Sequence, residues 1–227
     1  MLRQVIAPIH PDGWRFIALF AVASLVLYWI AHPLGWIGLL ATLWCAYFFR
    51  DPWRVTPTRP GLVVAPADGR IVAVDAAPPP PELDMGAAPM LRIGIFLNVL
   101  DVHINRIPMG GRIIRRIHHP GAFLNASLDK ASEDNERMSL RIATPEGDIA
   151  VVQIAGLVAR RIVCGVDAGD TVVAGQRFGL IRFGSRTDVY LPATWARLAS
   201  VGQRAVGGET VIADARSGEP PRQAMEH

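Results

Sequence analysis

A stretch without a single charged side chain, from Phe16 to Phe49, constrains this sequence more than any other feature. His32 and Pro33 divide it into two apolar halves of 16 residues each. An α-helix of that length spans about 24 Å, somewhat less than the ~30 Å hydrocarbon core of a bilayer. Two short spanning helices and a hairpin that dips into one leaflet both fit this pattern. A disordered chain does not.

The flanks of this stretch predict its orientation. Arginines lie on both sides of it, at Arg3, Arg15, Arg50, Arg54 and Arg59. The positive-inside rule then places both ends in the cytoplasm. A cleaved signal peptide fits poorly, because the apolar stretch is double and lacks a small-residue cleavage site; a buried hairpin of a soluble protein is the other alternative. We expect an N-terminal tail over 1–13 and a membrane hairpin over 14–50, with the remainder on the cytoplasmic face of the inner membrane.

Beyond residue 51 the sequence changes to short, β-branched runs separated by Gly, Pro and Asp. Examples are LVVAPADGRIVAV, MLRIGIFLNVL and DTVVAGQRFGLIRF. This pattern is typical of a compact β-sandwich or barrel. The sequence therefore predicts a mainly β fold, with a β-rich domain over 51–215 and a flexible polar tail over 216–227. NASLDKASEDNER lacks the strand pattern and is predicted to form a short helix or an ordered loop.

Composition excludes several classes of protein and site. Two cysteines cannot build a disulfide framework or a four-thiolate zinc site, and HExxH, CxxC and phosphate-binding glycine loops are absent from the sequence. His118 and His119 are adjacent on a predicted strand and point to opposite faces, so they do not form a two-histidine metal site. We expect no metal. A net charge of only +3 argues against a nucleic-acid partner.

A binding module remains the alternative to an enzyme. Glycine-closed turns such as those in AGDTVVAGQRFGLI and VGQRAVGGETVI also occur in domains that carry biotin or lipoate. This sequence therefore also fits a non-catalytic, membrane-anchored β adaptor or carrier-like module. The carrier version needs a lysine at a hairpin tip, but Lys130, the only lysine, lies in LDKASED outside any predicted hairpin.

Three places in the sequence are candidates for chemistry. Gly184-Ser185, in FGSRTDVYLP, reads either as an ordinary turn or as a reactive pair. A serine hydroxyl that follows a glycine carbonyl can attack it where the backbone is strained and a base is near. His103, in LDVHINRIP, and Asp68, in PADG, read on their own as a packed histidine and a turn residue.

Five blocks, in this order, resemble those of the short bacterial phosphatidylserine decarboxylases: FFRDPWRVTP, VVAPADGRI, LDVHINRIP, HHPGAFLNASLDKASEDNER and RFGSRTDVYLP. The resemblance covers residues 14–215, nearly the whole chain. It implies a carboxy-lyase of phospholipid synthesis that converts phosphatidylserine to phosphatidylethanolamine and CO2. The same chemistry on a different serine phospholipid stays open.

The resemblance further implies a proenzyme that cuts itself between Gly184 and Ser185. The cut would give a large chain, 1–184, and a small chain, 185–227, which stay together as a heterodimer. Ser185 would become a pyruvoyl group that forms a Schiff base with the substrate amine. Such a group replaces pyridoxal phosphate, which needs a lysine anchor. A homo-oligomer of processed pairs is also implied.

Residue roles follow from the same resemblance. His103 would act as general acid or base, because the ordinary pKa of histidine suits proton transfer in the cytoplasm. Asp68 would support self-cleavage. Longer family members carry His-x-x-His in this block, whereas Arg106 occupies the second position here, so His119 is the alternative second imidazole.

The phosphate group of the substrate is anionic, so we expect cationic side chains to bind it. Arg112, Arg115 and Arg116, in GGRIIRRIHH, are candidate ligands, because arginine suits the recognition of phosphate. A solvated strand face explains the same three residues without any ligand.

Overall fold

The computed structural model describes residues 7–121, 135–156, 162–182, 184–222 and 224–225. The chain folds into two compact units, one of Met1–Trp53 with Leu100–Val102 and one of Arg54–Val99 with His103–His227. The short helix or ordered loop expected for NASLDKASEDNER, which includes Lys130, lies almost wholly outside the described residues.

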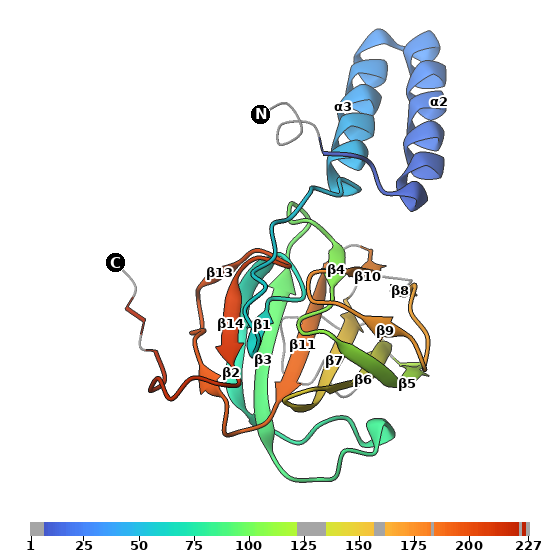
Figure 1. Ribbon diagram of the computed structural model, residues 1–227. Helices are drawn as coiled ribbons and strands as arrows, with labels where there is room; N and C mark the ends of the chain where they lie inside the picture. The colour runs from blue at the N-terminus through green and yellow to red at the C-terminus, as the bar shows by residue number, and fades with distance from the viewer. Residues whose placement is uncertain (1–6, 122–134, 157–161, 183, 223, 226–227) are drawn as a thin grey trace. The chain divides into compact units, whose positions relative to one another are not determined.

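The N-terminal unit is a helical hairpin (Figure 1). A 3-10 turn, η1 (Pro11–Gly13), leads into α2 (Trp14–Ile30), and α3 (His32–Phe48) follows after a single residue. That residue, Ala31, has an extended backbone, φ −157° and ψ 122°, which ends the first helix. Pro33 fits the first turn of α3, where its missing N–H is not needed. By length and composition, Pro11–Ile30 is the one described stretch long and apolar enough to cross a membrane.

The second unit consists of antiparallel strands, which confirms the mainly β prediction (Figure 1). Its main sheet, curled into half a barrel, has the order β13-β2-β3-β11-β7-β6-β5-β9 in the part of the chain that the structure describes, and two smaller sheets have the orders β1-β14-β12 and β4-β10-β8. The strands are β1 Leu62–Val64, β2 Gly69–Ala77, β3 Met90–Leu97, β4 Ile104–Arg106, β5 Gly111–His119, β6 Arg137–Thr144, β7 Gly147–Ala155, β8 Ile162–Cys164, β9 Thr171–Val172, β10 Arg177–Ile181, β11 Ser185–Leu191, β12 Ala196–Arg197, β13 Arg204–Ala205 and β14 Val211–Asp214.

The central strands of the main sheet are covered on both faces. Alternate residues of β3 and β11 enter the large core on one face, among them Ile93, Ile95, Val189 and Leu191. A smaller cluster covers the other face, with Leu83, Ala150, Val152, Ile154 and Tyr190. Each fully buried side chain of this size contributes about 1.5–3 kcal/mol. Every residue of β11 is buried, so its polar side chains need partners within the protein.

One such partnership is a buried ion pair on β11 itself. Arg186 Nε donates to Asp188 Oδ1 at 2.6 Å, and both side chains are shielded from solvent. Gly94 of β3 lies directly opposite Asp188. A Cβ at Gly94 would come within 2.6 Å of the Arg186 guanidinium, so the glycine makes room for the pair.

The loop between β2 and β3 places the carboxylate of Glu82 against the main sheet. Glu82, in the 3-10 turn η2 (Pro81–Leu83), accepts hydrogen bonds from Arg137 Nε at 2.7 Å and Ser139 Oγ at 3.0 Å. Burial by itself raises the pKa of Glu82. The hydrogen bonds from Arg137 and Ser139, and that from its own backbone N–H, outweigh burial and hold the pKa below its ordinary value.

We expect the free energy of unfolding of the Glu82→Gln variant to change less with pH in acid than that of the parent protein. A carboxylate whose pKa is lowered by folding stabilises the protein above its unfolded-state pKa of about 4.3, and this contribution is lost as the pH falls through the folded-state pKa. The variant should be less stable by about 2 kcal/mol at pH 7 and approach the parent below pH 4. Thermal unfolding against pH measures this, with the exposed Glu219→Gln as control. An equal difference at every pH would contradict the prediction.

Candidate active site

Ser185 is the first residue of β11 and directly follows the glycine of the FGS motif. Gly184 has φ +62°, in the left-handed region that glycine enters without strain, and a Cβ there would meet no described atom within 4 Å. The Ser185 side chain is 0% exposed, and its Oγ has no hydrogen-bond partner among the described residues. A buried hydroxyl without a partner costs stability, so its presence calls for another explanation.

Strand pairing fixes Ser185 from both sides. It lies opposite Leu97 of β3 and Ala155 of β7. The Ala155 carbonyl accepts a hydrogen bond from Nδ2 of the buried Asn135 at 2.7 Å, and the Ala155 N–H donates to the Glu136 carbonyl at 2.9 Å. The backbone around Ser185 is thus held at the end of the sheet by strands that are far apart in the sequence.

Three buried polar side chains form a ladder on the Ser185 face of β11. Gln153 Nε2 donates to Asn105 Oδ1 at 2.7 Å, and Asn105 Nδ2 donates to Thr187 Oγ1 at 3.2 Å. Thr187 is two residues from Ser185, so both side chains point to the same face of the strand. The ladder therefore ties β4 and β7 to this face of β11.

His103 is completely buried and directly precedes β4. Its carbonyl accepts a hydrogen bond from the N–H of Ile181, which lies four residues before Ser185. Asn105, two residues after His103, reaches Thr187, and alternate residues of a strand face the same side. The backbone of His103 thus lies beside the end of β10, the strand that leads into Gly184 and Ser185.

Asp68 directly precedes β2 at the same end of the sheet. The strand order β2-β3-β11 and its register place it about two strand spacings, ~10 Å, from Ser185. The Asp68 carboxylate is buried. It accepts hydrogen bonds from Arg54 Nη2 at 2.6 Å and from the Gly207 N–H at 2.8 Å. These two donors hold the carboxylate at the sheet end where Ser185 lies.

The other predicted imidazole is more remote. His119 is exposed at the end of β5, and β6 and β7 separate it from β11, a distance of about 14 Å across the sheet. Arg106, in the position of the second histidine of longer family members, is buried. Its Nη1 donates to the Gly175 carbonyl at 2.9 Å.

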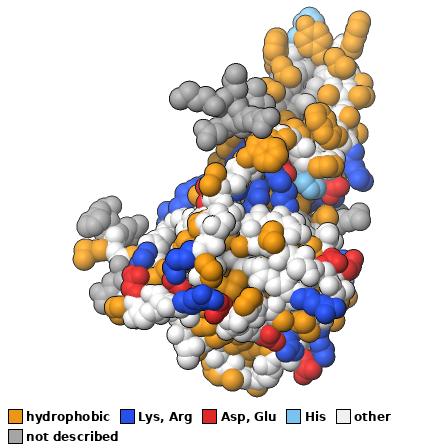
Figure 2. All heavy atoms as spheres, in the orientation of Figure 1, with side chains coloured by type: hydrophobic (Ala, Val, Ile, Leu, Met, Phe, Trp, Pro, Cys, Tyr) orange, Lys and Arg blue, Asp and Glu red, His pale blue; other side chains and the backbone are white. Residues whose placement is uncertain are grey.

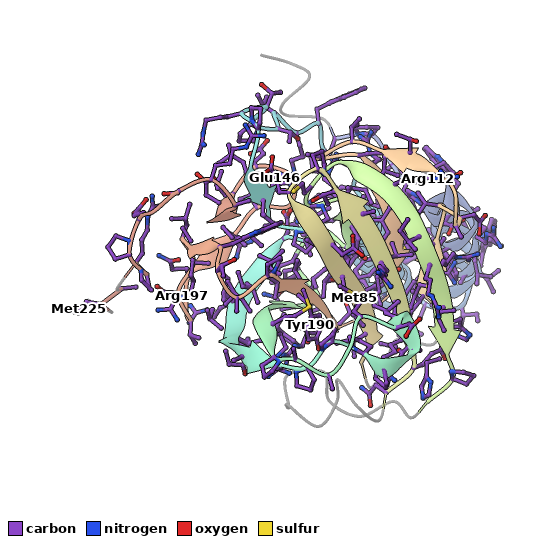
Figure 3. The ribbon with its side chains drawn as sticks, turned by 60° about the horizontal axis from the view of Figure 1, so that its bottom comes forward. Met85, Arg112, Glu146, Tyr190, Arg197 and Met225 are labelled. Atoms are coloured by element: carbon purple, nitrogen blue, oxygen red, sulfur yellow. The ribbon has the colours of Figure 1, made fainter. Side chains whose placement is uncertain are left out.

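The three arginines proposed for phosphate lie on β5, near one side of the sheet. Figure 3 labels Arg112 on β5 and Tyr190 on the central strand β11. Arg115 pairs with Asp84 at 2.9 Å and Arg116 with Asp167 at 2.6 Å, both at the surface. Arg112 lies near the opposite end of the sheet from Ser185. The described fold does not bring these arginines to Ser185 within one chain, and phosphate binding by them stays a prediction.

Sequence reasoning missed Arg54, Asn105 and Gln153. A signal for the ladder was present, because SRTDVYLP places four polar or charged residues in succession within a predicted β run. Polar residues in a buried strand require partners, and Asn105 stands two residues after the candidate histidine. The partner of Asp68, Arg54, gave no local signal.

Comparison with known proteins identifies the class to which this protein belongs. Residues 41–213 match the family model described as phosphatidylserine decarboxylase. Over 226 of its 227 residues, the sequence is 55% identical to the phosphatidylserine decarboxylase proenzyme of Beijerinckia indica subsp. indica and covers 97% of that protein. The chain is thus an enzyme, a carboxy-lyase. It belongs to the phosphatidylserine decarboxylase family, as the five sequence blocks predicted.

Proposed function

We propose that this protein cuts its own chain between Gly184 and Ser185 and then decarboxylates phosphatidylserine to phosphatidylethanolamine and CO2. One observation carries the proposal. Gly184 has a left-handed backbone conformation and directly precedes Ser185, whose hydroxyl is fully buried and has no hydrogen-bond partner among the described residues. The family supplies the reaction, since the 55% identical relative is a phosphatidylserine decarboxylase proenzyme.

Self-cleavage would proceed in three steps. Ser185 Oγ attacks the carbonyl carbon of Gly184 and the amide nitrogen leaves, so an ester replaces the peptide bond. Loss of the Ser185 Cα proton then breaks the Cβ–Oγ bond and releases a large chain that ends in the Gly184 carboxylate. The remaining dehydroalanine takes up one water and loses ammonia, which leaves a pyruvoyl group at the start of the small chain.

His103 and Asp68 would move the protons in these steps. Both are buried at the Ser185 end of the sheet, and proton transfer requires a group within hydrogen-bond reach of the reacting atoms. Arg54 and the Gly207 N–H hold the Asp68 carboxylate in one orientation. Because Arg106 occupies the second histidine position, we propose that His103 serves both self-cleavage and decarboxylation.

The surroundings of Ser185 fit a small carbonyl group that must be kept from bulk water. A pyruvoyl carbonyl supplies the electron sink that decarboxylation of an amino acid requires. Complete burial excludes water, and the ladder from Gln153 through Asn105 to Thr187 holds the adjacent strand face in one geometry. His103 would donate the proton that replaces the lost carboxylate on the substrate Cα.

A phospholipid substrate requires a membrane surface. We therefore place the enzyme on the cytoplasmic face of the inner membrane, attached through its apolar hairpin, with both ends of the hairpin inside. Arg112, Arg115 and Arg116 remain the proposed phosphate ligands. Their distance from Ser185 means that they would reach the substrate from a second copy of the chain, in the homo-oligomer that the family resemblance implies.

The two products of the cut are expected to stay together. The small chain contains β11, which lies between β3 and β7 of the large chain, and β14, which pairs with β1. The Asp68–Gly207 hydrogen bond also crosses the cut, as do the ion pairs Arg59–Asp214 and Arg216–Glu146.

Intact mass, measured in native and in denaturing conditions, tests the proposal. The native particle should contain both chains. The denatured sample should contain two species, 1–184 and 185–227, the second lighter than its unmodified sequence by one ammonia. A single unbroken chain that persists for days in lipid or detergent would contradict self-cleavage and favour the adaptor alternative.

A further inference from the structure

The outer surface of the helical hairpin is apolar on every side. Its large aliphatic side chains that are more than half exposed are Leu19, Val22, Leu25, Val26, Ile30, Ile37, Leu40 and Leu43. Figure 2 shows many hydrophobic side chains on the visible part of this unit. A helix that is apolar all round belongs in a protein core or a membrane, and these side chains are exposed.

The polar groups in the middle of the hairpin face each other. Ser24 Oγ donates to the Phe20 carbonyl at 2.6 Å, and Thr42 Oγ1 donates to the Gly38 carbonyl at 2.9 Å. The two hydroxyl oxygens lie 3.1 Å apart across the helix pair. Polar groups at mid-bilayer depth must be satisfied inside the protein, and Ser24 and Thr42 meet that demand without help from solvent.

Small residues bring the two helices close together. A Cβ at Gly38 would lie 2.6 Å from Ser24 Oγ, and a Cβ at Gly35 would lie 2.5 Å from Tyr28 Cβ. Helix pairs in lipid associate through close backbone packing of this kind, because lipid gives no hydrophobic drive for association.

Aromatic side chains with polar atoms mark both ends of the hairpin. Within residues 14–49, Trp and Tyr occur only in two groups, Tyr28, Trp29 and Trp36 near the turn and Trp14, Trp44 and Tyr47 near the base. Trp29 is 88% exposed, and Tyr28 packs on His32 with ring centroids 4.6 Å apart. Such residues gather at the two membrane–water interfaces, so the hairpin carries an anchor for each interface.

We propose that the hairpin crosses the whole bilayer and places the turn at Ala31–Pro33 in the headgroup layer of the far leaflet. Pro11–Ile30 is long and apolar enough to cross by itself. The returning helix α3, with 17 residues, reaches about 25 Å, and local thinning of the bilayer covers its shortfall. A hairpin confined to one leaflet would bury His32 and the aromatic group near the turn in hydrocarbon. This inference extends the proposed membrane attachment and is independent of the decarboxylase chemistry.

Cysteine labelling tests this topology on the full chain. Cys45 and Cys164 are the two native cysteines and are first replaced by alanine. The His32→Cys variant then reports on which side of the membrane the turn lies. Val55→Cys, at a residue 83% exposed in the second unit, is the matched cytoplasmic control. A membrane-impermeant maleimide is applied to intact spheroplasts and to inverted vesicles, and phosphatidylserine decarboxylation verifies that each variant is folded.

The expected result is that His32→Cys reacts on intact spheroplasts and Val55→Cys reacts only in inverted vesicles. Reaction of His32→Cys only after detergent would place the turn inside hydrocarbon and overturn the proposal. Reaction of both variants only in inverted vesicles would place the hairpin on the cytoplasmic surface and also overturn it. In either case, the Val55→Cys protein should still sediment with membranes if the proposed membrane attachment is correct. Sedimentation therefore distinguishes a wrong topology from a wrong membrane attachment.

Discussion

Replacing Ser185 with alanine is expected to leave a full-length chain without decarboxylase activity. A methyl group cannot attack the Gly184 carbonyl, so neither the ester nor the group derived from it can form. Because the Ser185 hydroxyl is buried without a described partner, its removal should not lower stability. Intact mass, release of CO2 from phosphatidylserine and thermal unfolding measure the three parts of this expectation.

Ser200→Ala is the matched control. Ser200 Oγ donates to the Arg222 carbonyl near the surface, in the same small chain, and this variant should cut itself and react normally. Normal cleavage of Ser185→Ala would refute the assignment of the nucleophile. An uncut but active variant would refute the proposed origin of the cofactor.

Replacing His103 with alanine should abolish decarboxylation. Removal of a general acid typically costs about 10²–10⁴-fold in rate. Arg106 occupies the position of a second imidazole on β4, and its Nη1 donates to the Gly175 carbonyl. Activity is expressed per mole of cleaved chain, so that a defect in self-cleavage and a defect in catalysis are counted separately.

His119→Ala serves as the comparison, because His119 is exposed and three strands from Ser185. It should keep both cleavage and activity. His103→Gln preserves a polar, hydrogen-bonding side chain in the buried position and separates loss of proton transfer from loss of folding. Full activity of His103→Ala together with loss in His119→Ala would move the general acid to His119.

The local pattern of the sequence predicted the elements well. The His32-Pro33 break predicted two helices, and the turns between β-branched runs predicted a mainly β unit, because both signals depend on neighbours in the chain. Gly184 and Ser185 stood out through the family blocks. The left-handed backbone of Gly184 and the complete burial of Ser185 fit that reading, although spacing alone favoured an ordinary turn.

The order of the strands was beyond the reach of the sequence. β11 pairs with β3 and β7, partners that no local pattern reveals, and the ladder from Gln153 to Thr187 exists only through that pairing. For the same reason, the sequence could not show where Arg112 lies relative to Ser185. In the sheet, the two residues lie near opposite ends.

If the chain is cut as proposed, the position of β11 between β3 and β7 of the large chain would prevent the mature enzyme from refolding as a single chain. An uncut chain finds its own central strand at the high effective concentration that a covalent connection provides. After the proposed cut, a denatured enzyme would have to reassemble from two separate chains, at a rate that falls with dilution. Refolding of the uncut Ser185→Ala protein should be independent of concentration, and the lifetime of the processed enzyme should be set by its first complete unfolding.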